Sequence, residues 1–175
     1  AWAWLRRGWA LVGEAPPCAE HGWIMLLQAD IAFLAHADPQ AAQRQASEAL
    51  ELARTLPDAD VEVVALAISG SALVASGAVA EGLERLDESA SLAVGETFED
   101  PAAPGWALCH TVSACADVGD FARAAQWSRA LNTWSESWQA RHFLGVCRTA
   151  YGEVLAAGGG WAAAGGGLRS AIRGL

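Results

Sequence analysis

The chain has 175 residues, of which 53% are hydrophobic and 18% charged, a balance typical of a chain that folds around a core. All 11 basic residues are Arg, which excludes a P-loop with its lysine, a Schiff-base lysine and a serine–lysine dyad. The formal net charge of −9 argues against binding to nucleic acid or to an anionic membrane, because both need basic patches.

Helical patterns follow one another along the chain, and no segment alternates with the period of a strand, so we expect an all-α fold. A leading helix over 2–14 should end at Pro16 and Pro17, through which no helix continues. Four helical hairpins are predicted after it, over 21–56, 60–94, 104–136 and 140–173. Their paired helices are expected at 21–36 and 39–56, at 60–76 and 79–94, at 104–118 and 120–136, and at 140–157 and 161–173. In the first hairpin, Asp38 is the expected N-cap and Pro39 the first helical residue.

The hairpins repeat with a period of about 40 residues when they are aligned on Asp38, Ala78, Asp120 and Gly160. Four residues after each alignment point stands a small side chain (Ala42, Gly82, Ala124, Ala164). Five residues before it stands Phe33, Leu73, Cys115 or Leu155. A small residue facing a bulky one predicts closely packed antiparallel helices. The exception is the last helix, where glycines at 165–167 weaken the helical pattern.

Each hairpin resembles a tetratricopeptide repeat, and the fourth unit matches best, with Tyr151, Gly152 and Leu155 followed by Trp161, Ala164 and Leu168. The resemblance implies one right-handed α-solenoid over residues 1–175. The period exceeds the 34 residues of the ordinary repeat. Asp30 and Val112 stand where a small residue is expected. HEAT-like repeats therefore remain an alternative.

Longer strings, APPCAEHGWIMLLQADIAF, VGDFARAAQWSRALNTW and CRTAYGEVLAAGGGWAAA, resemble the repeat region of large actinobacterial transcription regulators of the LuxR type. In that family a nucleotide-binding module precedes the array and a helix-turn-helix follows it. This chain starts without Met and stops inside a predicted helix. We therefore expect it to be a fragment, with ATP and DNA binding belonging to other parts of the protein.

Catalytic and metal sites find little support in the sequence. The four His are scattered without a zinc-binding spacing. Cys109 beside His110 is expected to be a structural pair rather than a nucleophile and its base. Acidic residues cluster only in connecting or exposed stretches, where we expect solvated surface (Asp58, Asp60, Glu62, Glu96, Glu99, Asp100). The sequence thus predicts no enzyme, no cofactor and no metal site.

Tryptophans line one face of two helices. Trp127, Leu131, Trp134 and Trp138 form one such face, and Trp2, Leu5 and Trp9 form the other. We expect most of these rings to wedge between hairpins, and the alternative is an exposed aromatic surface, above all at Trp2 and Trp4.

The predicted function is binding. In tetratricopeptide arrays the first helix of each pair lines a concave groove that takes a peptide or a neighbouring domain. The corresponding positions are Ile24, Leu27, Ile31, Leu34, Val64, Ala67, Ser71, Trp106, Cys109 and Ser113, with Val146, Thr149 and Glu153 in the last unit. Alternatively, these side chains simply pack the array. The lining is apolar, so an apolar protein segment or a flanking domain is the expected partner.

The sequence therefore predicts a non-catalytic scaffold for protein–protein or interdomain contacts in a bacterial transcription regulator. Four cysteines without a C-x-x-C pair, no secretory signal and no membrane span predict a reduced, cytoplasmic setting. The alternative function is a structural oligomerisation module, such as a homodimer joined through the Trp faces.

Overall fold

The computed structural model describes residues 2–138 and the single positions 152, 156, 159 and 165. The described part is all-α and contains no strand. Its seven helices are α1 (Trp2–Val12), α2 (Ala19–His36), α3 (Pro39–Thr55), α4 (Ala59–Ala75), α5 (Val79–Gly95), α6 (Ala102–Asp117) and α7 (Phe121–Trp138). Each begins and ends within about two residues of its predicted bounds. The predicted hairpin 140–173, with its aligned positions Gly160, Ala164 and Leu155, lies outside the described residues apart from those single positions.

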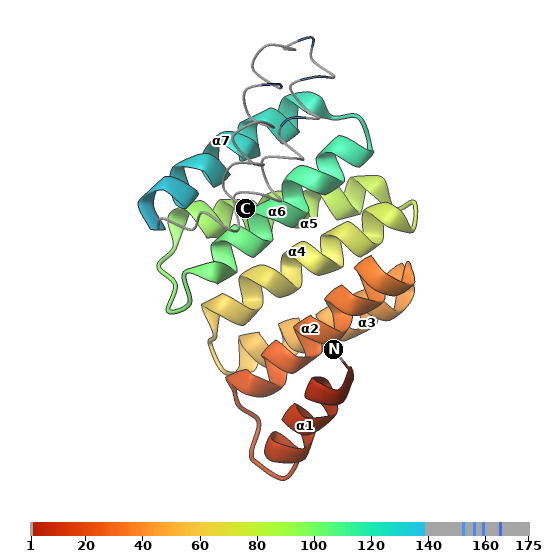
Figure 1. Ribbon diagram of the computed structural model, residues 1–175, viewed down its shortest axis with the longest axis vertical. Coiled ribbons are helices and arrows are strands. Elements are labelled where there is room, and N and C mark those ends of the chain that lie inside the picture. The colour runs from red at the N-terminus through yellow and green to blue at the C-terminus, as the bar shows by residue number, and fades with distance from the viewer. Residues whose placement is uncertain (1, 139–151, 153–155, 157–158, 160–164, 166–175) are drawn as a thin grey trace.

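The helices are stacked in chain order along the long axis of the molecule, with α1 at one end and α7 toward the other (Figure 1). Helices α2, α4 and α6 lie on the near side of that view, and α3 and α5 lie behind them. Consecutive helices pack against each other, and α4 also contacts α2 and α6. The first helices of the three described hairpins therefore form one row.

Local sequence signals explain where the helices begin. The Asp38 carboxylate accepts a hydrogen bond from the Ala41 amide at 2.9 Å, with Pro39 in the first turn, which confirms the predicted cap of α3. Asp58 caps α4 in the same way through the Val61 amide at 3.0 Å.

The turns after α4 and α6 share one backbone design. Gly77 and Gly119 have φ of 91° and 79°, a left-handed backbone conformation that residues with a side chain rarely adopt. The next residue in each turn donates its amide back to the preceding helix, Ala78 to the Leu73 carbonyl at 3.0 Å and Asp120 to the Cys115 carbonyl at 2.9 Å. The second and third hairpins therefore have the same turn conformation, about 40 residues apart, in agreement with the period seen in the sequence.

Helix α4 forms the centre of the core. It is apolar on every side, and 14 of its 17 residues are buried. A helix that is hydrophobic all round must be covered all round, and here α2, α3, α5 and α6 cover it. Arg85 and Ser89 of α5 fasten it further by donating to Ser69 Oγ and to the Val63 carbonyl, both at 2.7 Å.

Two of the small residues predicted to allow close helix packing, Gly82 and Ala124, lie at close contacts between helices. A Cβ on Gly82 would lie 2.7 Å from the Gly70 carbonyl oxygen and 2.7 Å from Val74 Cγ2, so α4 and α5 touch backbone to backbone. Ala124 and Cys115 are both fully buried and share a small cluster between α6 and α7.

Aromatic side chains of α7 wedge between helices, as predicted. Leu131 is buried in a cluster with residues of α5 and α6, and Trp127 and Trp134 pack against it. Gly105 of α6 leaves room for the Trp134 ring, because a methyl group there would collide with it. At the other end of the molecule Leu5 is buried, whereas the side chain of Trp4 is 73% exposed.

One prediction about the acidic residues is wrong. Asp60 is not solvated surface; it is 9% exposed and accepts hydrogen bonds from the amides of Glu99 at 3.1 Å and Asp100 at 2.9 Å. Burial raises the pKa of this carboxyl above its ordinary value. Its role is to hold the loop between α5 and α6 against the start of α4.

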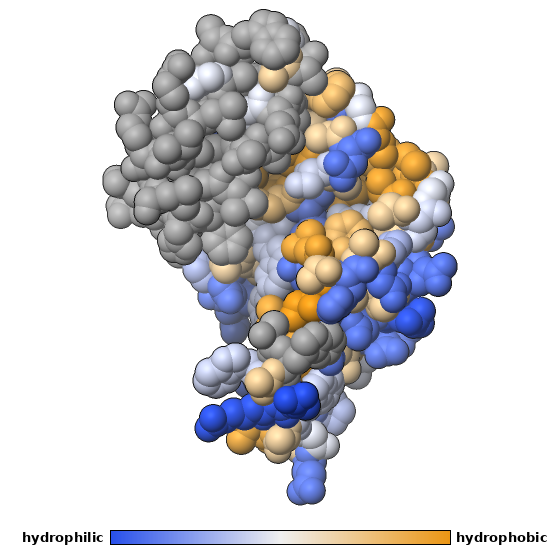
Figure 2. Space-filling view, turned by 45° about the vertical axis from the view of Figure 1, so that its right-hand side comes forward, coloured by the Kyte–Doolittle hydropathy of each residue, from blue (hydrophilic) through white to orange (hydrophobic). Residues whose placement is uncertain are grey.

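Within the described residues, no helix combines the length and the apolar character that crossing a membrane would require. On the face shown in Figure 2, apolar patches alternate with strongly hydrophilic ones.

Candidate functional site

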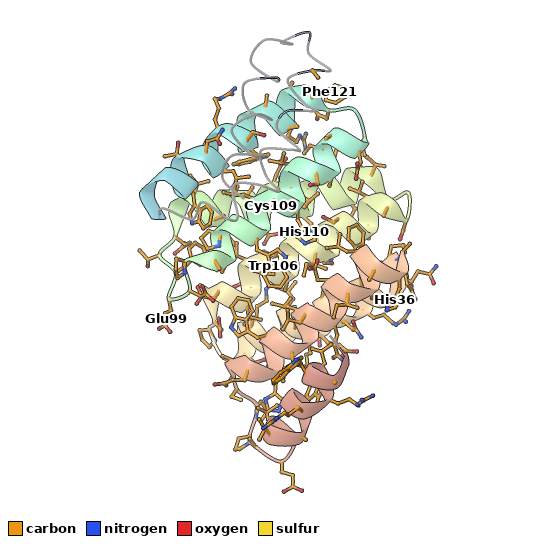
Figure 3. The ribbon with its side chains drawn as sticks, viewed as in Figure 1. His36, Glu99, Trp106, Cys109, His110 and Phe121 are labelled. Carbon is orange, nitrogen blue, oxygen red and sulfur yellow. The ribbon has the colours of Figure 1, made fainter. Side chains whose placement is uncertain are left out.

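A pocket with a cavity volume of about 670 Å³ opens between α2, α4 and α6. The residues that line it are Asp30, Phe33, Leu34, Ser71, Val74, Ala75, Trp106, Cys109, His110, Ser113, Ala114, Asp117 and Val118. Trp106, Cys109 and His110 mark its position on α6 in Figure 3. A mostly apolar wall with a few polar groups, at this volume, is the usual make-up of a ligand site.

Three polar side chains of the pocket, one from each of the three helices, are joined by hydrogen bonds. Nε2 of His110 on α6 lies 3.1 Å from Oδ1 of Asp30 on α2. Nδ1 of the same ring lies 3.2 Å from Oγ of Ser71 on α4. His110 is 8% exposed and Ser71 3% exposed, so these groups form part of the pocket floor. We call these three side chains the polar strip.

The hydrogen bonds within the strip indicate where its protons lie and which of its atoms remain as hydrogen-bond acceptors. A carboxylate only accepts, so Nε2 of His110 carries the proton that faces Asp30. In the neutral ring Nδ1 is then the acceptor, and the Ser71 hydroxyl donates to it. The second carboxylate oxygen of Asp30 and the lone pairs of Ser71 remain as acceptors.

Aromatic rings form the walls beside the strip. Trp106 stacks on Trp23 of α2, with ring centroids 6.2 Å apart and planes 20° apart, which holds the indole in place. Phe33 packs against the His110 ring at a centroid distance of 6.1 Å.

The predicted groove residues divide into four groups. Leu34, Ser71, Trp106, Cys109 and Ser113 line the pocket. Val64 and Ala67 are fully buried in the core around α4, where they have no surface to offer a partner. Leu27 is exposed outside the pocket, and Ile24 and Ile31 are half-buried on α2, Ile24 facing Gly8 of α1. Val146, Thr149 and Glu153 lie outside the described residues.

Sequence reasoning missed Asp30 and His110 as members of one site. Asp30 stands out as a carboxylate in an apolar stretch at a position where the repeat pattern expects a small residue. The structure explains this departure, because the carboxylate pairs with His110 of the hairpin after next. A charged residue in a buried helix face was therefore the signal available in the sequence.

The strip has the residue types of a serine hydrolase triad, but the surrounding backbone does not suit that chemistry. Ser71 lies inside α4, whose amides are engaged in helical hydrogen bonds. Helix α4 therefore leaves no free backbone amide of its own beside the hydroxyl to stabilise an oxyanion. Cys109 is not a free thiol in the structure, so it does not form a nucleophilic pair with His110. Among the described residues, no group of three or more His, Cys, Asp or Glu is placed to hold a metal ion.

A smaller cavity of about 500 Å³ lies at the N-terminal ends of α2 and α4, beside the loop between α5 and α6, next to Asp60, Trp23 and Phe98. Its one buried carboxyl already accepts two backbone amides. A larger part of its lining is polar than in the pocket around the strip, so it suits an apolar ligand less well.

Comparison with known proteins found no matching family model, no matching curated protein and no matching solved structure.

Proposed function

We propose that this chain is a non-catalytic binding module whose pocket between α2, α4 and α6 takes an apolar segment of a protein partner. The observation that carries the proposal is the pocket itself, with apolar walls contributed by the first helix of each described hairpin. In this reading the helices form a right-handed, tetratricopeptide-like solenoid. The near row of α2, α4 and α6 and the repeated turns at Gly77 and Gly119 support it.

The wider context of the proposal comes from the sequence. The strings that resemble the LuxR-type repeat region support a regulatory array in a cytoplasmic bacterial transcription regulator, with a partner or a flanking domain docking on the pocket face. Cys18 and Cys115 are free thiols, as a reducing compartment would keep them, whereas Cys109 is disulfide-bonded. The bonded Cys109 departs from the reduced cysteines that the sequence predicts.

The test is a selection of helical peptides from a random display library on the whole chain. Leu34 and Val118 line the pocket and are exposed, Leu34 to 70%, so replacing either with Asp should leave the fold intact. Selected peptides should lose most of their affinity for Leu34→Asp and Val118→Asp. They should bind normally to the matched control Val94→Asp, since Val94 is 59% exposed on α5 and does not line the pocket.

A selection that yields no binder, or binders that are indifferent to both pocket changes, would contradict the proposal. The absence of esterase activity is tested separately. Hydrolysis of p-nitrophenyl acetate should not differ between the native chain and Ser71→Ala.

A further inference from the structure

We propose that the pocket between α2, α4 and α6 is a site for a small organic cation, an ammonium group on an aromatic or aliphatic body. This inference rests on the proposed function, since it assigns a ligand to the same pocket. Beyond the proposed function, it names the chemical class of a small ligand that would occupy the cavity.

The charges of the lining residues favour a cation. Asp30 and Asp117 both line the pocket, and among its described lining residues none is Arg. His110 adds at most one positive charge, so the described lining residues carry a formal charge of −2 with a neutral ring and −1 with a protonated ring. A cationic ligand would also meet a chain with a net charge of −9.

The ends of the helices add to this negative potential. Leu34 lies in the last turn of α2, Val74 and Ala75 end α4, and Asp117 ends α6; all of them line the pocket. The C-terminal end of a helix carries a partial negative charge, up to about half an elementary charge, because its peptide dipoles are aligned. Three such ends therefore border one side of the cavity.

The walls suit the rest of such a ligand. Trp106, held by its stack on Trp23, and Phe33 supply aromatic surfaces on which a cation or an aromatic body can lie. The polar strip supplies hydrogen-bond acceptors, the second oxygen of Asp30 and the lone pairs of Ser71, for the N–H groups of an ammonium. A carboxylate ligand would be repelled by Asp30 and Asp117 at the same place.

The experiment compares three probes with one apolar body: 4-phenylbutylamine, 4-phenylbutanol and 4-phenylbutyrate. Isothermal titration calorimetry on the whole chain at low ionic strength should give the amine an affinity about tenfold above that of the alcohol. The carboxylate should bind more weakly than either. Added salt should reduce the preference for the amine, because it screens the charges of the pocket.

Two variants and a matched control separate the pocket from the overall charge. Asp30→Asn should remove most of the amine preference, and Asp117→Asn, at an exposed position, should reduce it without touching the strip. Glu48→Gln removes one charge from the exposed face of α3 and should leave the preference unchanged.

Equal affinity for the three probes overturns the cation assignment but leaves the peptide-binding proposal in place. Absence of binding by all three probes also overturns it, and the peptide selection then tests the pocket as a partner site independently. A preference for the amine that survives both Asp changes would place the cation elsewhere and would equally overturn the assignment.

Discussion

Oδ1 of Asp30 lies 3.1 Å from Nε2 of His110, and this contact joins α2 to α6 across 80 residues of sequence. Helix α4 lies between them and contributes Ser71 to the other side of the ring. The floor of the pocket is therefore assembled from three hairpins at once. Its geometry depends on how the hairpins are stacked, which gives the strip a structural role beside any role in binding.

Asp30 and His110 should be energetically coupled. Asp30→Ala and His110→Ala should each destabilise the chain by about 1–3 kcal/mol, because each leaves a buried polar partner unsatisfied. The double variant should lose less than the sum of the two, with a coupling energy of about 0.5–3 kcal/mol. Urea unfolding followed by circular dichroism measures all three.

Arg129 of α7 provides the control pair, since it is exposed and no described hydrogen bond joins its side chain to Asp30. Asp30→Ala and Arg129→Ala should be additive within about 0.5 kcal/mol. A native pair that is equally additive would show that the 3.1 Å contact carries no net energy.

The contact between α4 and α5 should tolerate no side chain at Gly82. Gly82→Ala would place a methyl group against the Gly70 carbonyl and the Val74 backbone, and it should destabilise the chain by about 1–3 kcal/mol. Gly95→Ala is the matched change on the same helix, where a methyl group meets nothing within 4 Å. It should be neutral or stabilising by up to about 1 kcal/mol. Thermal unfolding compares the two, and equal effects would contradict the packing at Gly82.

Asp60 should make stability depend on pH in an unusual direction. Asp60→Ala should cost about 1–3 kcal/mol near neutral pH, because the amides of Glu99 and Asp100 lose their acceptor. Burial raises the pKa of Asp60, so the folded chain holds this proton more tightly than the unfolded chain.

The contribution of Asp60 to the free energy of unfolding is thus greatest below the ordinary carboxyl pKa of 3.8 and falls as pH rises through the raised value. The difference between the native chain and Asp60→Ala should shrink as pH rises from below 3.8 toward neutral. Denaturant titrations over this range measure it, and a difference that grows with pH would refute the assignment.

Cys115 should be chemically inert while the chain is folded. It is fully buried, and burial raises the pKa of its thiol to about 12, so almost no thiolate exists at pH 8. Cys18 is half-buried near the surface, with its Sγ 3.1 Å from Nδ1 of His21. Iodoacetamide should therefore label Cys18 first, as read by peptide mass spectrometry.

Unfolding the chain in guanidinium should make Cys115 as reactive as Cys18. Native labelling of Cys115 at the rate of Cys18 would contradict its burial between α6 and α7. The same pKa shift implies that stability declines as pH rises above the ordinary thiol value of 9.0, because the unfolded chain releases this proton first.

Local features of the fold could be predicted because local sequence causes them. The cap at Asp38 and the helix start at Pro39 follow from the conformations that these residues favour. The apolar run of α4 favours a central position for a different reason: a helix that is apolar on every side must be covered on every side.

The site depended on contacts between distant residues, and the sequence carried only indirect signs of them. Asp30 was visible as a departure from the repeat pattern, but its partner was not, because many residues could have lain opposite it. The sequence around Asp60 is that of an exposed acidic stretch, and only the structure shows that the amides of Glu99 and Asp100 cover its carboxylate.

The sequence by itself determined an all-α chain of short helices with small residues at the helix contacts, because helix propensity, capping and apolar periodicity act within a few turns. Only the tertiary structure decided that Asp30, Ser71 and His110 meet, and that the C-terminal ends of α2, α4 and α6 border one pocket. These contacts depend on the relative placement of whole hairpins, which the packing of side chains between them sets.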